Sequence, residues 1–246
     1  MKVNHAFANE NVFLPKETKS KTLNPRKYSK FVKRWLPRNV KNQVIGDPFQ
    51  EFNHEYKCIF IHIPKCAGIS VGKSLFGVMA GHSKVWHYEF YDEQLFHKYF
   101  KFTFVRNPWD RLVSAFHFLK KGGRNSLDRK WAKDHLQEIA SFNEFVQRIG
   151  DDTVFQSEVL NQQHFRPQVH YLKDAEGAIS LDFIGKFESL EEDFMKIAEE
   201  LDVQTTLKEI NKGAHKHYSE YYNGDSQDIV SLIYREDIEF LNYDFH

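Results

Sequence analysis

The amino-acid sequence predicts an α/β protein in which a mostly parallel sheet is flanked by helices. Two short runs of β-branched and aromatic residues, at 57–63 and 99–105, have the composition of strands buried on both faces. Each run leads through a short loop into a stretch with apolar residues at helical spacing. Strands that alternate with helices are typical of parallel sheets, and 246 residues suit a single sizeable domain.

The chain divides just before the first predicted strand. Residues 1–55 are polar, basic and interrupted by prolines, so we expect an irregular N-terminal arm with one short helix at 28–35. Residues 56–246 form the folded domain. The lysines and arginines of 16–41 indicate either a solvated face or a contact for a polyanionic substrate or an acidic partner.

The predicted elements follow in order along the domain. A helix over 108–121 has the clearest start signal, because Asn107 suits the N-cap and Pro108 the first helical position. A second helix is predicted to start at Ser189, with Glu192 completing a capping box. The stretch 122–135 has no clear period and is predicted to be a mobile loop. The other predicted elements are helices over 69–80, 88–98, 138–149 and 225–241 and a strand within 179–187.

Composition and charge exclude several classes of function. The formal net charge is zero, which gives no electrostatic case for binding nucleic acid or a membrane. Two cysteines, Cys58 and Cys66, make neither a disulfide framework nor a zinc site, so a reducing compartment is expected. No apolar run is long enough to span a membrane, and the first residues lack the apolar centre of a signal peptide. We therefore expect a cytoplasmic protein.

The segment 62–74, HIPKCAGISVGKS, predicts an anion site between the first strand and its helix. Backbone N–H groups and the dipole at a helix N-terminus attract anions, and Gly68 permits a close backbone approach. The segment contains two candidate lysines. Lys73 belongs to a near match to the nucleotide-binding G-x-x-x-x-G-K-[ST] motif, in which Ala67 replaces the first glycine. Lys65 instead lies in the loop directly after the strand, which favours it as the working lysine.

A second anion site is predicted at the end of the second strand. Arg106 follows that strand and precedes a helix N-terminus. Ser114 lies two helical turns beyond Asn107, on the same side of the helix, so Arg106 and Ser114 are placed to hold one phosphate. No aspartate for magnesium ends this strand, unlike in most P-loop enzymes. Two separate sites suit a nucleotide with two well-separated phosphate groups.

The pair FIHIPKCAGIS and FTFVRNPWDRLVSAF resembles the signature motifs of sulfotransferases that use 3′-phosphoadenosine 5′-phosphosulfate (PAPS), and most closely those of the carbohydrate O-sulfotransferase branch. Residues 164–172, 184–194 and the C-terminal segment extend the resemblance from about residue 57 to the end of the chain. The second motif is complete. The first departs at Ile69, where a hydroxyl residue is usual, so one phosphate contact is lost or passes to Ser70.

The resemblance implies a P-loop-like parallel sheet that binds PAPS without a metal and transfers its sulfuryl group to an acceptor hydroxyl, expected to belong to a carbohydrate. Lys65 would neutralise charge on the leaving phosphate, and Arg106 with Ser114 would bind the 3′-phosphate. Arg111 would either support that site or form a structural ion pair. The residues expected to cradle the 5′-phosphate are Cys66, Ala67, Gly68, Ile69 and Ser70.

The acceptor hydroxyl needs a general base, and histidine suits that task near neutral pH. His82 is the first candidate, because relatives place a histidine at a corresponding position; His87 and an acid such as Glu89 are alternatives. His62, within the strand, is expected to be buried and hydrogen-bonded. Residues 164, 166 and 168 either line the acceptor side or pack a loop.

Two other functions remain open from the sequence. One is a P-loop nucleotide kinase or NTPase that uses Lys73 and Ser74. The other is a non-catalytic anion-binding protein on the same fold.

Overall fold

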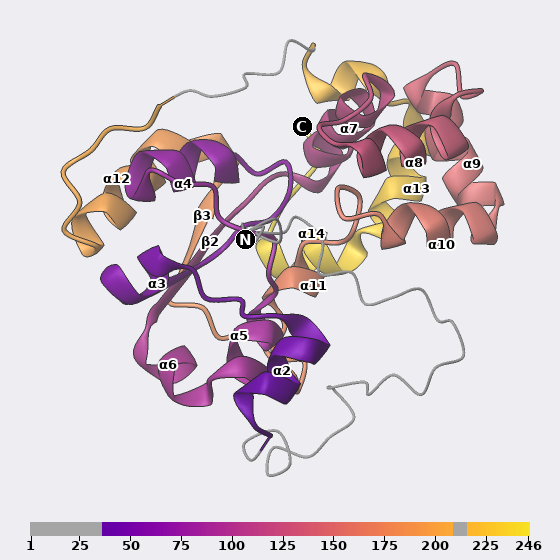
Figure 1. The fold of residues 1–246 in the computed structure, drawn as a ribbon. Helices are drawn as coiled ribbons and strands as arrows, with labels where there is room; N and C mark the ends of the chain where they lie inside the picture. Colours follow the sequence, from indigo (N-terminus) through magenta and orange to yellow (C-terminus); the bar gives the residue numbers. More distant parts are fainter. Residues whose placement is uncertain (1–35, 209–215) are drawn as a thin grey trace.

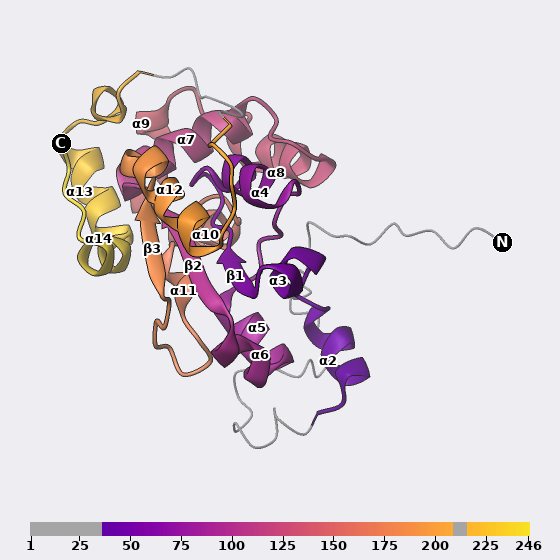
Figure 2. The same cartoon turned by 90° about the vertical axis from the view of Figure 1, so that its left-hand side faces the viewer.

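A computed structural model describes residues 36–208 and 216–246. Its centre is a sheet of three parallel strands in the order β1 (Cys58–Ile61), β2 (Phe100–Val105) and β3 (Phe183–Lys186) (Figures 1 and 2). Phe60 pairs with Phe102 across the first strand pair, and Phe104 with Gly185 across the second. The predicted α/β class and the parallel sheet are confirmed.

Alternate strand residues point into two apolar layers. Phe60, Phe102 and Phe104 pack in the smaller layer with buried residues of three helices. These helices are α3 (Glu51–Glu55), α4 (Gly68–Phe76) and α12 (Leu190–Glu200). Ile59 and Ile61 point into the larger layer on the opposite face. The strands are therefore covered on both sides, which explains their continuous apolar sequence.

The other helices form two groups around the sheet (Figure 1). One group lies by the amino end of β2 and consists of α2 (Arg38–Ile45), α5 (Val85–Tyr91) and α6 (Glu93–Lys98). The other includes α7 (Pro108–Lys120), α8 (Ser126–Leu136), α9 (Phe142–Asp151), α10 (Thr153–Asn161) and α13 (Gly224–Ile233). The short elements are α11 (Val169–Leu172), α14 (Arg235–Leu241) and the 3₁₀ turns η2 (Phe187–Ser189) and η3 (Tyr218–Tyr221). Because α7 starts directly after β2, this second group adjoins the carboxyl ends of the strands.

Helix α7 begins as predicted. The Asn107 side chain accepts hydrogen bonds from the backbone N–H groups of Trp109 and Asp110, and Pro108 occupies the first helical position. This cap fixes the direction in which the helix leaves the sheet.

The loop predicted at 122–135 is wrong, because α8 covers most of that stretch. Its N-terminus is capped by the Asn125 side chain, which accepts from the Asp128 N–H. The residues that α8 buries are Asp128, Ala132 and Leu136, four positions apart. The first of these is an acid, so the apolar period was too weak to be recognised from the sequence.

Two long predicted helices are each divided in two. Asp92 separates α5 from α6: its backbone is extended and its side chain caps α6. Tyr234 separates α13 from α14. The capping box predicted at Ser189 is also wrong, because the Ser189 hydroxyl donates to the Asp193 carboxylate 2.7 Å away and makes no cap bond.

Within the described residues, two helices lie before the first strand. Helix α3 contributes Phe52 to the smaller apolar layer, and α2 contributes Ile45 to the larger one. The helix predicted at 28–35 lies outside the described residues.

Candidate functional site

The predicted site residues converge at one edge of the sheet. Because the strands are parallel, their carboxyl ends share that edge, and each strand leads into a loop there. The loop after β1 contains Lys65, and Arg106 directly follows β2. Phe187 and Glu188 follow β3 in the same way. The Arg106 Nη1 donates to the Lys65 carbonyl oxygen at 3.2 Å, so the two predicted anion-binding segments are in direct contact.

The backbone of the first loop is held in an unusual conformation. Lys65 has φ 73° and Ala67 φ 59°, values that side-chain-bearing residues rarely adopt. Ala67 is also the N-cap of α4, and its side chain makes no cap bond. As the N-cap, Ala67 therefore offers no side-chain acceptor to the N–H groups of the first turn, at a helix end where an anion can bind.

Gly68 is needed for the contact between this helix and His62. A Cβ atom at Gly68 would lie 1.9 Å from the His62 ring. The His62 Nδ1 lies 2.8 Å from the Ala80 carbonyl oxygen, to which it must donate. The predicted buried, hydrogen-bonded role of His62 is confirmed, and burial lowers its pKa to about 4.

The Lys65 side chain is enclosed by cations and an aromatic ring. Its Nζ lies 4.0 Å from the ring centroid of Phe118 on α7. Burial, followed by the charges of Arg106 and Arg111, lowers the pKa of Lys65 to about 8. An anion bound at this ammonium group would relieve both effects.

Arg106 retains donors for a ligand. Its Nε donates to the Asp110 carboxylate at 2.7 Å, and its guanidinium stacks 4.1 Å from the Phe187 ring centroid. With the contact to Lys65, two of its five N–H donors are in use. Ser114 lies half-buried one turn beyond Asp110, on the helix face that Arg106 contacts.

Arg111 is buried beneath the first loop. Its Nε donates to the Pro64 carbonyl oxygen at 3.0 Å, and its side-chain Nη2 is buried without a hydrogen-bond partner. Among the described residues, this hydrogen bond holds Arg111 and no carboxylate forms the ion pair considered for it. Arg111 instead links α7 to the Lys65 loop, and its charge adds to the positive potential there.

The alternative lysine, Lys73, is exposed to solvent. Lys73 is exposed on α4, whereas Ser74 is buried and its hydroxyl accepts from the Lys208 N–H at 2.9 Å. A Cβ at Gly72 would lie 2.9 Å from the Val78 carbonyl oxygen, so this glycine serves close packing. The near match to a nucleotide-binding motif is explained by helix packing.

His82 lies against His62. The ring centroids are 4.1 Å apart, and the His82 Nδ1 lies 2.9 Å from the His62 carbonyl oxygen. Because a carbonyl oxygen only accepts, Nδ1 bears the proton and Nε2 holds the lone pair. Burial and the neighbouring His62 hold the pKa of His82 well below its usual value.

A second histidine near Lys65 is paired with a carboxylate that the sequence did not reveal. The His164 Nε2 lies 3.2 Å from the Asp128 carboxylate, and both residues are buried. The His164 ring also contacts Phe118, with centroids 4.8 Å apart. Burial lowers the pKa of His164 despite the carboxylate. Asp128 comes from α8, the helix that was predicted to be a loop.

The other candidates for the general base, His87 and Glu89, make hydrogen bonds to backbone N–H groups near them. His87 is buried and its Nδ1 lies 3.3 Å from the Lys84 N–H, while the Glu89 carboxylate accepts from the Ala175 N–H at 3.1 Å. Cys66 is buried with its thiol 3.3 Å from the Gln168 side-chain oxygen. Burial raises the pKa of this thiol to about 12, which is unfavourable for a nucleophile.

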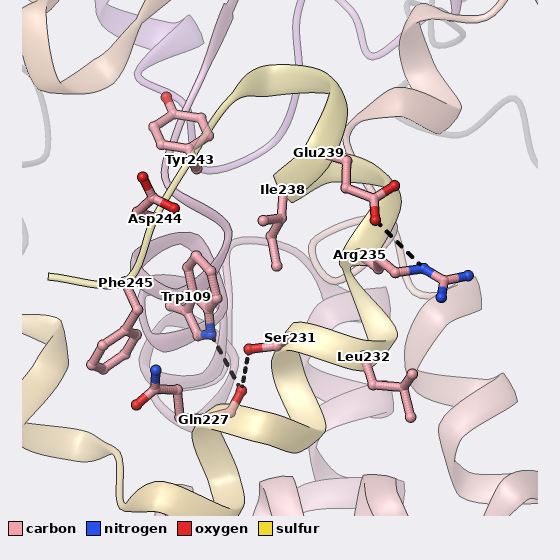
Figure 3. A pocket seen from close by; sticks show the side chains of 10 residues that line it. All are labelled: Trp109, Gln227, Ser231, Leu232, Arg235, Ile238, Glu239, Tyr243, Asp244 and Phe245. Atoms are coloured by element: carbon pink, nitrogen blue, oxygen red, sulfur yellow. Dashed lines mark hydrogen bonds and ion pairs between the residues drawn. The ribbon is translucent and has the colours of Figure 1, made fainter.

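A surface hollow lies on the C-terminal helices and the tail that follows them (Figure 3). Trp109, Ile238, Tyr243 and Phe245 supply its aromatic and aliphatic lining. None of the predicted site residues lines it, so we do not assign it to the reaction.

Comparisons with known proteins assign the chain to a family. The model of the Sulfotransferase family matches residues 51–244, and the chain belongs to this family. The chain is 29% identical over 178 residues to carbohydrate sulfotransferase 10 of Danio rerio, an alignment that covers 62% of this chain and 48% of that protein. It is 30% identical over 132 residues to an uncharacterized protein of Archaeoglobus fulgidus, covering 51% of this chain and 88% of that one. No solved structure matches the chain significantly.

The family assignment supports sulfuryl transfer as the class of reaction. The chain spans about half the length of the zebrafish protein. Within the residues that the structure describes, no helix combines the length and apolarity that a bilayer span requires.

Proposed function

We propose that the protein transfers a sulfuryl group from PAPS to an acceptor hydroxyl. The observation that carries the proposal is the direct contact between Arg106 and the Lys65 loop, which brings two anion-binding segments together at one sheet edge. PAPS has two separated anionic groups, and the site offers two sets of donors. The N-terminus of α4, whose N-cap Ala67 makes no side-chain cap bond, and the Lys65 ammonium suit the 5′-phosphosulfate. The unused donors of Arg106, with the Ser114 hydroxyl, suit the 3′-phosphate.

Residues 65–70 contribute to the first of these positions in different ways. Lys65 supplies the charge that stabilises the leaving phosphate. The backbone of Ala67, Gly68 and Ile69 forms the concave loop around the 5′-phosphate. Cys66 is buried below the loop, so its contribution is the main chain. Ser70 is placed in the first turn of α4, where its N–H faces the same end as the others. Ile69 offers no hydroxyl, and the backbone donors compensate for it.

In the reaction, the acceptor oxygen forms a bond to sulfur while the bond from sulfur to the bridging phosphate oxygen breaks. The acceptor proton passes to a base, and the adenosine 3′,5′-bisphosphate leaves. We propose His82 as that base, because its Nε2 holds a lone pair and its lowered pKa keeps it neutral at pH 7. Lys65 would stabilise the growing negative charge as an ammonium ion.

We propose a carbohydrate as the source of the acceptor hydroxyl. The support for it is the name of the zebrafish relative, a carbohydrate sulfotransferase, together with the resemblance of the two motifs to that branch.

Binding and transfer can be tested with matched variants. The protein is titrated with adenosine 3′,5′-bisphosphate, and ³⁵S-labelled PAPS is then incubated with the protein and a panel of glycans. Arg106→Ala should abolish binding, whereas Lys73→Ala should leave it unchanged because Lys73 is exposed on α4. Absence of bisphosphate binding by the unmodified protein would refute the proposal. Binding without transfer to any acceptor would instead favour a non-catalytic relative.

A magnesium-dependent kinase or NTPase remains the competing function. It predicts ATP binding that requires magnesium and is lost in Lys73→Ala. The packing roles of Gly72 and Ser74 disfavour this alternative.

A further inference from the structure

The Gln168 side chain contacts both segments of the predicted anion site, namely the Lys65 loop and Arg106 at the end of β2. It is fully buried, and its Nε2 donates to the Arg106 carbonyl oxygen at 2.8 Å. Its Oε1 accepts from the Arg106 N–H at 2.9 Å, so the amide pairs with both polar groups of one backbone residue. The same oxygen lies 3.3 Å from the Cys66 thiol. One side chain therefore contacts the first loop and the residue that ends β2.

Gln168 is itself fixed by a residue far along the chain. The two carboxylate oxygens of Asp237, on α14, accept from the backbone N–H groups of Gln168 and Val169 at 2.7 and 2.9 Å. Asp237 is fully buried. Buried carboxylate bonds of this kind are strong, and they leave the Gln168 backbone little freedom.

We propose that Gln168, anchored by Asp237, is a positioning residue that holds the Lys65 loop and the Arg106 backbone at the spacing that the donor nucleotide requires. The role for the nucleotide rests on the proposed function; the role in holding the loop does not.

The geometry suits this task better than it suits general stabilisation. Arg106 lies just beyond the last residue of β2 that pairs with β3. The Gln168 amide therefore bonds to the N–H and C=O of Arg106, as a neighbouring strand would. The Lys65 loop has two residues at positive φ, so it needs support from outside to keep its shape. A shift of about 1 Å between two groups that bind one ligand is enough to lose much of the binding.

The two cysteines provide a test that needs no nucleotide. Both thiols are buried, and burial raises the pKa of each to about 12, so alkylation of either requires local opening. Cys58 lies in β1 and reports opening of the sheet, whereas Cys66 reports opening of the loop. Trypsin cleaves at lysines 57, 65 and 73, so the two thiols fall in separate peptides that mass spectrometry can follow.

Gln168→Met keeps the length of the side chain and removes its hydrogen bonds. We expect alkylation of Cys66 by iodoacetamide to become at least about tenfold faster, while the rate at Cys58 stays unchanged. Asp237→Asn should also accelerate alkylation of Cys66 relative to Cys58, but by a smaller factor. The asparagine side-chain oxygen still accepts one of the two backbone hydrogen bonds that Asp237 accepts. Gln156→Met is the matched control, since Gln156 makes one side-chain bond, to the Ile149 carbonyl oxygen on α9. Parallel acceleration at both cysteines, or none at Cys66, would overturn the proposal.

Bisphosphate binding then separates the two proposals. Gln168→Met should weaken adenosine 3′,5′-bisphosphate binding by about tenfold or more and raise the KM for PAPS, with the acceptor KM unchanged. An unchanged affinity would refute the role of Gln168 in the donor site. If the unmodified protein fails to bind the bisphosphate, the proposed function fails, while the ratio of the two cysteine rates still decides whether Gln168 holds the loop.

Discussion

If Lys65 binds the donor nucleotide as proposed, its charge makes bisphosphate binding depend on pH in a way that can be calculated. Its pKa in the free protein is about 8, lowered first by burial and then by Arg106. A bound phosphate favours the ammonium form, so binding raises this pKa and takes up a proton. Affinity is therefore nearly complete at pH 7 and declines as the pH rises through the free-protein pKa of about 8.

The size of the effect follows from the fraction of Lys65 that is charged. With a pKa of about 8, about nine-tenths of the side chains are protonated at pH 7 and about one-tenth at pH 9. We expect the dissociation constant for the bisphosphate to rise about tenfold over this range. The ligand keeps a constant charge there, because the second pKa of a phosphate is about 6. Nearby histidines are already neutral, and the pKa of the Cys66 thiol is about 12.

Isothermal titration calorimetry at several pH values measures the constant, and buffers of different ionisation enthalpy measure the proton uptake. Lys65→Arg is the decisive variant, since its guanidinium stays charged and its binding should be flat from pH 7 to pH 9. Lys73→Ala should keep the full pH dependence. A flat profile for the unmodified protein, or a tenfold decline that persists in Lys65→Arg, would refute the assignment of Lys65.

Three further outcomes follow from the site. His82→Asn should lower turnover about 10²- to 10⁴-fold while bisphosphate affinity stays within about twofold. Steady-state kinetics measures the turnover and calorimetry the affinity. Unchanged turnover would contradict the assignment of His82 as the base. Because burial and His62 lower the pKa of His82, turnover should hold as the pH falls through 6.5 and decline only well below that value, which a pH–rate profile checks. Gly68→Ala places a Cβ 1.9 Å from the His62 ring. The free energy of unfolding, measured by thermal denaturation, should fall by about 1–3 kcal/mol, and nucleotide binding should weaken. Unchanged stability and binding would show that the His62 ring can move aside.

The preference for Lys65 over Lys73 rests on the sequence and stays a prediction. The distance of each lysine from the strand favoured Lys65, and the missing first glycine and the missing acid after β2 argued against Lys73. The structure adds the physical reason: Lys73 lies on the exposed side of α4, while Gly72 and Ser74 serve packing contacts. Spacing along the chain was informative here because the loop is only a few residues long.

Contacts between distant segments could not be predicted in this way. Asp128 meets His164 only because α8 folds back beside α7, and its helix was hidden by the acid in its buried stripe. Gln168 was considered only as part of the acceptor side or of an ordinary loop. Its pairing with Arg106 and the anchor at Asp237 depend on segments more than 60 residues apart, as the separations of 62 and 69 show. No local pattern in one sequence records such a contact.

The charge balance of the site explains why these supports are needed. Lys65, Arg106 and Arg111 lie close enough for both arginines to lower the pKa of the lysine, and Asp110 is the one carboxylate bonded directly to them among the described residues. Like charges at such spacing repel, so without a ligand the loops would tend to move apart. The bonds from Arg106 to the Lys65 carbonyl, from Arg111 to Pro64 and from Gln168 to both segments oppose that movement. If an anion binds at this edge as proposed, its binding energy is then not spent on assembling the site.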